Sequence, residues 1–214
     1  MALHSVNGFL NWTVLTVLLT MAAATTWTFE NDAEGKLPAG WSATKTGEGQ
    51  GSVWKVVAYD AGRALAQTSS EGPSALFNLC VADGAKYADV DLSVRVKAVS
   101  GENDRGGGLV WRYRDANNYY VCRWNPLENN FRVYHVLNGK RTQLATADVS
   151  AAPDDWHVVR AVQQGNHIQC YLDGKLLLDV ADGTLQDAGA IGVWCKADAV
   201  SWFDDVSVQS LGKE

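Results

Sequence analysis

Residues 106–145 read GGGLVWRYRDANNYYVCRWNPLENNFRVYHVLNGKRTQLA. Short apolar and aromatic runs alternate here with turn signals, and apolar residues do not recur with the spacing of an amphipathic helix. Asn138-Gly139 is the strongest hairpin signal in the chain, because two-residue hairpin turns need residues that accept positive φ. Residues 114–117 give a second turn signal, of the Asp/Asn type. We therefore expect antiparallel strands at 106–113, 118–125 and 130–137, with a return strand from Lys140.

Strand-and-turn units continue on both sides of this stretch. In DVDLSVRVKAV (89–99), Val90, Leu92, Val94 and Val96 alternate with polar residues, as in a half-buried strand. The segment 42–75 has the weakest secondary-structure pattern, with strand-like pieces at 53–58 and 64–67. Further strands are expected at WHVVRAVQ (156–163), HIQCYL (167–172), KLLLDV (175–180), GAIGVWCKAD (189–198) and SWFDDVSVQ (201–209). Many short strands without helices predict an all-β fold, an antiparallel two-sheet sandwich.

The composition limits the number of domains and the class of partner. The chain has 214 residues and shows no linker, repeat or low-complexity tract, so we expect one domain at 25–214. A formal net charge of −6 and the lack of any basic run argue against a nucleic-acid or anionic-membrane partner, because both depend on Lys and Arg. The high content of Trp and Tyr suits a core and a sugar-stacking surface equally well.

The N-terminus has the features of a secretory signal peptide over residues 1–24. Residues 1–29 contain no Asp, Glu, Lys or Arg, the run FLNWTVLTVLLTMAAA (9–24) is mostly apolar, and its end offers a small-residue cleavage site. The first residues lack a Lys or Arg, so an uncleaved anchor or a misassigned start is the alternative. The run is shorter than the ~20 residues of a spanning helix. We expect a secreted or periplasmic mature chain without a membrane span.

Four cysteines lie within the expected domain: Cys80, Cys122, Cys170 and Cys195. In an oxidising compartment they could pair in three ways. Three of them lie in strand-like runs, where a free thiol behaves as a small buried hydrophobe. We expect buried thiols, with disulfides as the alternative.

A hypothetical register assigns the strands of 106–137 to two faces. If Tyr113 lies opposite Tyr119, Trp111 lies opposite Val121, and we further pair Arg123 with Arg132. One face is then a core candidate, with Val110, Arg112, Tyr120, Cys122, Trp124, Phe131, Val133 and His135. The other mixes aromatics and arginines, with Leu109, Trp111, Tyr113, Tyr119, Val121, Arg123, Arg132 and Tyr134. The mixed face favours a binding groove, and packing under a loop is the alternative.

The motif order G-L-x-W-R-Y, N-Y-Y, N-x-L-E-x-N, N-G-K-R, K-A-D and F-D-D runs from residue 108 to residue 205. In these motifs the chain resembles bacterial secreted domains of the concanavalin A-like superfamily, of the 3-keto-disaccharide hydrolase or laminin G-like type. The resemblance covers most of the chain from Trp27 and implies a jelly-roll sandwich. It implies an activity less well, because this fold carries lectins, carbohydrate-binding modules, glycosidases and lyases. The E-x-D-x-E strand of family-16 glucanases is absent.

The leading hypothesis is a secreted carbohydrate-binding domain that recognises a glycan on the aromatic and arginine groove. One alternative is a glycoside hydrolase of the 3-keto-disaccharide type, and another is a laminin G-like adhesion module that binds protein. Sugar recognition needs aromatic rings with planar donors and acceptors for hydroxyls. The candidate ligand-binding residues are Trp111, Tyr119, Arg123, Asn125, Glu128, Asn130, Tyr134, Trp194, Lys196 and Asp198. An ion-pair network that closes the end of the sandwich would use the same charged residues.

Catalysis has weaker candidates. Glycoside hydrolysis normally uses two carboxylates, roughly 5 Å apart for retention and roughly 6.5–9.5 Å apart for inversion. Glu128 and Asp198 are the pair we nominate. Cleavage of a 3-keto sugar by proton abstraction would instead need a base such as His135 or His157. A structural histidine is the alternative for both.

No cofactor is required on this interpretation, but a structural Ca²⁺ is a further expectation. Jelly-roll carbohydrate-binding modules often hold the ion between their first and last strands. The segments TFENDAEG (28–35) and FDDV (203–206) resemble that arrangement, with Glu30, Asp32, Asp204 and Asp205 as ligands. Solvated carboxylates at strand ends are the alternative.

Overall fold

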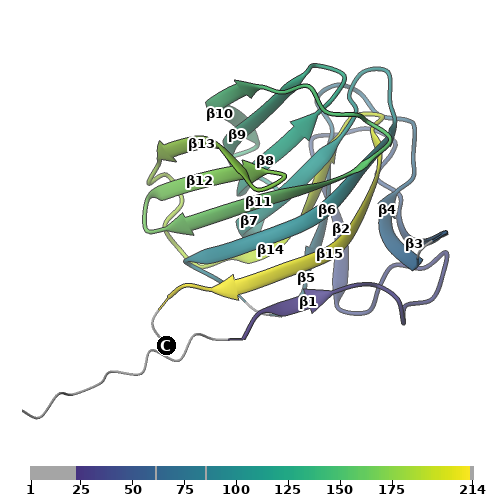
Figure 1. The fold of residues 1–214 in the computed structure, drawn as a ribbon, viewed down its shortest axis with the longest axis horizontal. Helices are drawn as coiled ribbons and strands as arrows, with labels where there is room; N and C mark the ends of the chain where they lie inside the picture. The colour runs from purple at the N-terminus through teal and green to yellow at the C-terminus, as the bar shows by residue number, and fades with distance from the viewer. Residues whose placement is uncertain (1–22, 61, 85, 213–214) are drawn as a thin grey trace, which may run out of the picture.

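The computed structural model describes residues 23–60, 62–84 and 86–212. Over these residues the chain forms two antiparallel sheets packed face to face, without a helix (Figure 1). In this view the eight-stranded sheet lies in front of the seven-stranded sheet. The predicted all-β sandwich is confirmed.

The eight-stranded sheet has the order β13-β12-β11-β6-β15-β4-β3, with β1 paired to β15. Its strand β6 has the predicted alternation, since Val90, Leu92, Val94 and Val96 are buried and the residues between them are not. The bounds are β1 Thr25–Trp27, β3 Trp54–Tyr59, β4 Gly62–Gln67, β6 Val90–Ser100, β11 Trp156–Gln164, β12 His167–Leu172, β13 Lys175–Ala181 and β15 Val200–Ser210.

The seven-stranded sheet has the order β10-β9-β8-β7-β14-β5-β2. Its strand β5 was not expected, because FNLCVA is buried at every position and so lacks the alternation of a half-exposed strand. The bounds are β2 Trp41–Thr46, β5 Phe77–Ala82, β7 Gly107–Asp115, β8 Asn118–Asn125, β9 Asn130–Leu137, β10 Lys140–Asp148 and β14 Ala190–Lys196.

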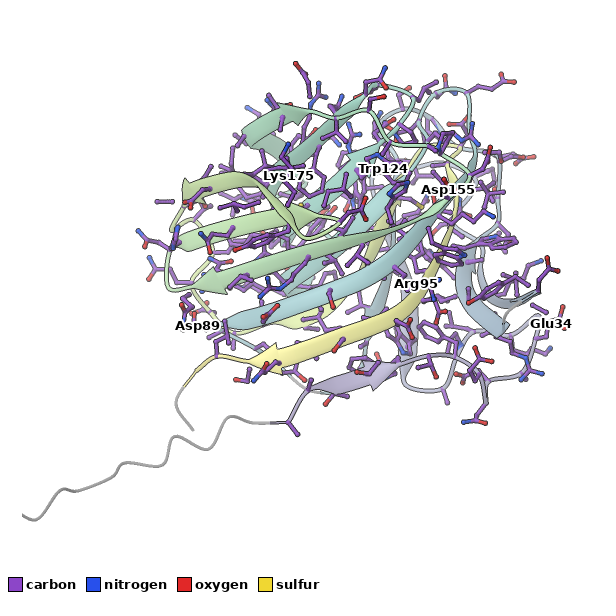
Figure 2. The ribbon with its side chains drawn as sticks, in the orientation of Figure 1. Glu34, Asp89, Arg95, Trp124, Asp155 and Lys175 are labelled. Atoms are coloured by element: carbon purple, nitrogen blue, oxygen red, sulfur yellow. The ribbon has the colours of Figure 1, made fainter. Side chains whose placement is uncertain are left out.

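The main core lies between the two sheets. Trp124, Phe131 and Phe203 are fully buried there, and Trp124 is labelled in Figure 2. Each such side chain stabilises the fold by about 1.5–3 kcal/mol or more through burial of its apolar surface. The core therefore provides the free energy that holds the two sheets in one arrangement.

Two turns with positive φ at both central residues set the register of their hairpins, and the first of them was predicted. Asn138 and Gly139 have φ values of 51° and 77° and join β9 to β10. Asp173 and Gly174 have φ values of 50° and 78° and join β12 to β13. Positive φ at both central residues matches the right-handed twist of the paired strands, which explains the Asn-Gly and Asp-Gly sequences.

The register of β7 differs from the expected one because of a bulge. Arg123 lies opposite Arg132, as predicted. Trp111, however, lies opposite Tyr120 and not Val121. The pairing shifts after Trp111, and Arg112 has a positive φ of 44°. A bulge adds a residue to one strand and reverses the alternation that follows.

The bulge changes the composition of the two faces. Leu109 and Trp111 belong to the main core, whereas Val110 packs on the outer face of the seven-stranded sheet. The predicted groove position of Trp111 is therefore wrong. Its Nε1 donates to Gln163 Oε1 at 2.5 Å inside the protein.

The outer face of the seven-stranded sheet is concave and carries a second apolar cluster. Its fully or almost fully buried members are Phe77, Leu79, Val81, Val110, Tyr119, Val121, Tyr134, Val136 and Trp194. Three strands separate β2 from β8 in the sheet order, which corresponds to about 19 Å in a flat sheet. Yet Thr46 Oγ1 of β2 lies 2.8 Å from Tyr119 Oη of β8 and also donates to the carbonyl of Ala116. The seven-stranded sheet is therefore curved, and its own side chains fill the concave side between β2 and β8.

The predicted signal peptide over residues 1–24 lies almost wholly outside the described residues. Among the residues that the structure does describe, no helix has the length and apolar character needed to cross a membrane.

All four cysteines are buried as free thiols. Cys122 of β8 and Cys170 of β12 face each other across the main core, and burial raises the pKa of Cys122. Buried thiols, rather than disulfides, are what the structure contains.

Candidate functional site

A group of charged side chains lies at one end of the concave face. We call Asp104, Arg123, Glu128, Arg132, Arg141 and Lys196 the charged cluster. Arg123 and Arg132 are neighbours on β8 and β9 and lie on the outer face because they share the register of Tyr134 and Val121. Glu128 reaches both from the turn between those strands.

Glu128 is the centre of the exposed part of this cluster. Its Oε2 accepts hydrogen bonds from Arg123 Nη2 at 2.9 Å, Asn130 Nδ2 at 3.0 Å and Arg132 Nη1 at 3.1 Å. The turn is held by the Glu128 backbone N–H, which donates to Asn125 Oδ1 at 3.0 Å. Asn125 therefore shapes the loop that carries Glu128, and Asn130 orients the carboxylate.

Asp104 and Lys196 form the buried part of the cluster. Lys196 Nζ donates to Asp104 Oδ2 at 3.1 Å, and only 1% of the Asp104 side chain is exposed. The loop that carries Asp104 is fixed by Asp198, whose carboxylate accepts from the backbone N–H groups of residues 102–104 at 2.8–3.2 Å. Asp198 thus positions the loop, and Asp104 is the carboxylate that joins the charged cluster.

Arg141 of β10 extends over the middle of the concave face. Its guanidinium carbon lies 4.4 Å from the ring centre of Tyr134, 4.8 Å from that of Phe77 and 5.8 Å from that of Trp194. Cation–π attraction of this kind is strongest where water is excluded. The rings of three different strands therefore hold the guanidinium in a defined position.

The environment of the two carboxylates moves their pKa values in opposite directions. Burial raises the pKa of Asp104, and the nearby charges of Arg123 and Lys196 oppose that rise only in part. Burial acts on Glu128 in the same direction, but hydrogen bonds from Asn130 and Arg123 and the charges of both arginines lower its pKa to about 2. The charged cluster therefore contains a buried carboxylate, Asp104, with a raised pKa, and a partly exposed carboxylate, Glu128, with a lowered pKa.

Several donors of the site have no partner among the described residues. Arg123 is 1% exposed, and its Nε and Nη1 are buried without an acceptor. Arg141 Nη1 and the Tyr134 hydroxyl are likewise buried and unpaired. Such donors are costly to leave unsatisfied, so they are expected where a ligand or ordered water completes the bonding.

The predicted aromatic platforms are placed differently from the expectation. Tyr119, Tyr134 and Trp194 lie on the concave face, as their alternation requires, but they are at most 3% exposed. They form the floor under Arg141 and are not free for stacking with a sugar ring. The ring that remains partly exposed on this face is that of Tyr113, in a hollow at the opposite end.

This hollow has a volume of about 220 Å³, below the roughly 300–1,000 Å³ of most ligand pockets. Tyr113 and Thr44 line it together with Ser42, whose hydroxyl donates to Asp83 Oδ1 at 2.8 Å. The hollow is a secondary feature beside the charged cluster.

Both candidate histidines lie away from the concave face. His157 lies 2.7 Å from Asp173 Oδ2 and 2.9 Å from the carbonyl of Ala152, with its ring 4.5 Å from that of Trp124. His135 alternates with Tyr134 and so points inward, where its Nδ1 lies 3.4 Å from Asp182 Oδ2. Their contacts are structural, and neither lies beside the charged cluster.

Three of the four carboxylates predicted to bind calcium have protein partners, and for Asp32 the contact is to the backbone carbonyl. Glu30 accepts from the Arg63 backbone N–H at 3.1 Å, and Asp204 accepts from the Tyr59 hydroxyl at 2.8 Å. Asp205 pairs with Arg95 at 3.3 Å, and the carbonyl of Asp32 accepts from Arg63. Within residues 23–60, 62–84 and 86–212, no group of three or more His, Cys, Asp or Glu residues is placed to hold a metal ion. The calcium site remains a prediction.

Comparison with models of known protein families shows to which family the chain belongs. A family model described as the 3-keto-alpha-glucoside-1,2-lyase-like domain matches residues 28–209. The chain belongs to this family. The match includes every residue of the charged cluster and the whole of the seven-stranded sheet. No curated protein is significantly similar to the chain in sequence.

Solved structures show which fold this 3-keto-alpha-glucoside-1,2-lyase-like domain has. Carbohydrate-binding module CBM66 from Bacillus subtilis is 19% identical, with a TM-score of 0.65 over 80% of this chain and 96% of the module. A β-glucanase from Bacillus licheniformis is 13% identical, with a TM-score of 0.61 over 89% and 99%. The GH43 protein BlXynB from Bacillus licheniformis is 16% identical, with a TM-score of 0.60 over 86% of this chain and 38% of that protein. These likenesses show the fold and confirm the predicted concanavalin A-like jelly roll.

Sequence reasoning missed three residues of the site in this lyase-like domain. Arg141 follows the Asn138-Gly139 turn, and extending the hairpin register places it opposite Val136 and on the face of Tyr134. The sequence could therefore have predicted that Arg141 lies on the concave face. Asp104 and Phe77 had no comparable signal, because a loop and a non-adjacent strand bring them to the site.

Proposed function

We propose that the chain binds a carbohydrate at the charged cluster on the concave face. The observation that carries this proposal is the state of Arg141, a half-buried guanidinium that makes no hydrogen bond or ion pair with any described residue. Guanidinium and carboxylate groups recognise paired hydroxyls through bonds of fixed geometry. Arg141, Glu128 and Arg132 supply both kinds of group at the partly exposed edge of the cluster.

The comparisons support a carbohydrate as the ligand class. The family is described by a lyase of 3-keto-α-glucosides, and the structural neighbours include a carbohydrate-binding module and a β-glucanase. The concave face of this chain differs from the stacking groove expected from the sequence, because its rings support a guanidinium. The proposed recognition is therefore by hydrogen bonds and charge around Arg141.

Binding to a glycan panel tests the proposal. We expect at least one glycan to bind the purified domain, and Arg141→Ala and Glu128→Gln each to weaken that binding at least tenfold. Asp89→Asn is the matched control, because Asp89 pairs with Arg112 away from the charged cluster. Binding that survives both site variants, or no binding to any glycan, would reject the site.

A second candidate function is the elimination reaction named in the family description. In a 3-keto-α-glucoside, the carbonyl at C3 acidifies the C2 proton. A base removes this proton, the C1–O bond breaks, and the leaving oxygen takes up a proton, so no water is consumed. Asp104 is the candidate base, because its pKa is raised and its Oδ1 has no partner among the described residues; substrate would have to displace the side chains that bury it. Glu128 is suited to hold hydroxyl groups. Arg123 and Arg141 are the cationic groups of the cluster that would stabilise the enolate oxygen.

Turnover of a 3-keto-α-glucoside separates the two candidates. If the domain is a lyase, Asp104→Asn lowers kcat by about 100-fold or more, the usual contribution of a positioned base. Glu128→Gln then acts mainly on KM. Tight binding of the keto sugar without release of its aglycone would leave a binding domain and no lyase.

We also propose that the chain is exported. The support is the sequence of residues 1–24 alone. Expression of the full chain in a bacterial host, followed by N-terminal sequencing of the exported protein, tests this. The expected mature N-terminus is Thr25, and full-length protein retained in the cytoplasm would contradict the proposal.

A further inference from the structure

We infer that the carbohydrate ligand carries a carboxylate, as uronic acid residues do, and that Arg141 binds this group. The inference rests on the proposed carbohydrate function and narrows its ligand class. Three observations support it: the balance of charge in the cluster, the unpaired donors, and the position of Arg141 over three rings.

The charged cluster has more cations than anions, although the chain as a whole has a net charge of −6. Arg123 and Arg132 share the single carboxylate of Glu128, and Lys196 pairs with Asp104. Arg141 has no carboxylate within ion-pair distance among the described residues. A neutral sugar would leave this positive charge half-buried and uncompensated, whereas an anionic sugar would neutralise it.

Three of the four buried unpaired atoms of the cluster are donors, and the fourth is the acceptor Asp104 Oδ1. Arginine has five N–H donors and no acceptor, so the buried Nε and Nη1 of Arg123 and the buried Nη1 of Arg141 can be satisfied only by acceptor oxygens. A carboxylate offers two acceptor oxygens in the plane and spacing of a guanidinium fork. A neutral hydroxyl offers one oxygen and brings a further donor to a site that already has several.

Arg141 is also prepared for such a ligand before it binds. The rings of Phe77, Tyr134 and Trp194 hold its guanidinium in place, so little side-chain entropy is lost on binding. Other stacked arginines of this chain differ in one respect. Arg160 lies 4.8 Å over the Tyr171 ring but also donates to both oxygens of Asp91 at 2.6 Å. Arg141 has the same stacking without the carboxylate.

The experiment compares matched sugars by isothermal titration calorimetry. The probes are oligosaccharides of glucuronate, galacturonate and mannuronate, each with its methyl ester and its neutral counterpart. We expect at least one acid to bind tenfold or more tightly than both its ester and its neutral form. Arg141→Met keeps an apolar stem over the three rings but removes the guanidinium. It should bring the affinity for the acid down to the affinity that the same variant has for the neutral sugar.

Arg160→Met is the control for loss of a stacked arginine, and it should keep the preference for the acid. Urea unfolding of each variant shows whether it is folded. Equal binding of acids and neutral sugars would overturn the inference but leave the carbohydrate function standing, whereas binding of no sugar would overturn both. A preference for the acid that survives in Arg141→Met would overturn the assignment of a carboxylate to Arg141.

Discussion

The outer faces of the two sheets both combine aromatic rings with arginines, yet they differ in how their charges are satisfied. On the eight-stranded sheet, Arg95 lies 4.8 Å over the Trp156 ring and also pairs with Asp204 and Asp205 (Figure 2). Tyr59 packs between Trp156 and Trp202 on the same face. On the seven-stranded sheet, Arg141 stacks on three rings and has no such partner.

This difference separates a structural surface from a candidate site. Rings and arginines occur together for both purposes, so composition does not distinguish the two faces. Completed ion pairs indicate a surface whose groups stabilise each other. Buried donors without acceptors indicate a surface whose bonding is completed by something outside the chain.

The largest expected effect compares tryptophans of the two faces. Trp194→Ala removes a fully buried ring from the concave face and should lower the free energy of unfolding by about 3–5 kcal/mol. Trp202→Ala removes a partly exposed ring from the other face and should cost about half as much. Urea midpoints at constant m measure both. Equal costs would mean that the concave face is not a second core.

The next effect compares the two kinds of ion pair. Lys196→Met leaves the buried carboxylate of Asp104 unpaired and should cost about 3 kcal/mol. Arg95→Met breaks the partly exposed pair with Asp205 and should cost about 1 kcal/mol or less. The buried Asp204 also loses Arg95, at 3.5 Å, but keeps the hydrogen bond from the Tyr59 hydroxyl. Adding Asp104→Asn to Lys196→Met should recover part of the loss. A cost below about 1 kcal/mol for Lys196→Met would contradict the buried pair.

A smaller effect is expected on the free energy of unfolding at acid pH, to which the partly exposed Glu128 contributes. Its pKa is lowered from 4.5 to about 2 in the folded chain. Its stabilising contribution is therefore complete above about pH 4.5 and is lost as the pH falls toward 2. Asp104 acts in the opposite direction, because its raised pKa makes protonation favour the folded state.

Glu128→Gln should therefore make the free energy of unfolding fall less steeply between about pH 4.5 and 2. Urea unfolding at a series of pH values measures the slope. Since 37% of the Glu128 side chain is exposed, solvent screens part of the effect. An unchanged slope would show that the Glu128 network contributes no stability.

The smallest expected effect concerns the calcium site predicted from the sequence. If Glu30 and Asp205 contribute to a bound ion, a chelator should lower the melting temperature by about 2–4 °C, equivalent to about 1 kcal/mol for a chain of this size. Asp205→Asn should reduce the response. An unchanged melting temperature would eliminate the ion.

The sequence predicted the parts of the fold that depend on local patterns. The alternation from Val90 to Val96 and the positive-φ pair Asn138-Gly139 each report on neighbours along the chain. The assumed pairing of Arg123 with Arg132 is the observed one. The bulge after Trp111 has no such pattern, and one added residue was enough to exchange Trp111 and Val110 between faces.

The site was predictable only in part, because some of its residues come from segments that are distant in the sequence. Arg123, Glu128 and Asn130 come from one hairpin and were found together. Asp104 reaches them through a loop that Asp198 holds, and Phe77 reaches Arg141 because β5 lies four places from β9 in a curled sheet. Strand order and curvature are properties of the whole chain, so single segments do not report them.

The four buried thiols make the folded chain inert toward reagents that attack thiolates. Burial raises the pKa of Cys80 and Cys195, so neither accessibility nor ionisation favours a reaction while the sheets stay closed. Alkylation can proceed only through molecules that have transiently opened, and its rate then follows the equilibrium between closed and open forms. Each molecule thus carries its own reporter of opening, because mass spectrometry can follow the alkylation of each cysteine separately without an engineered probe.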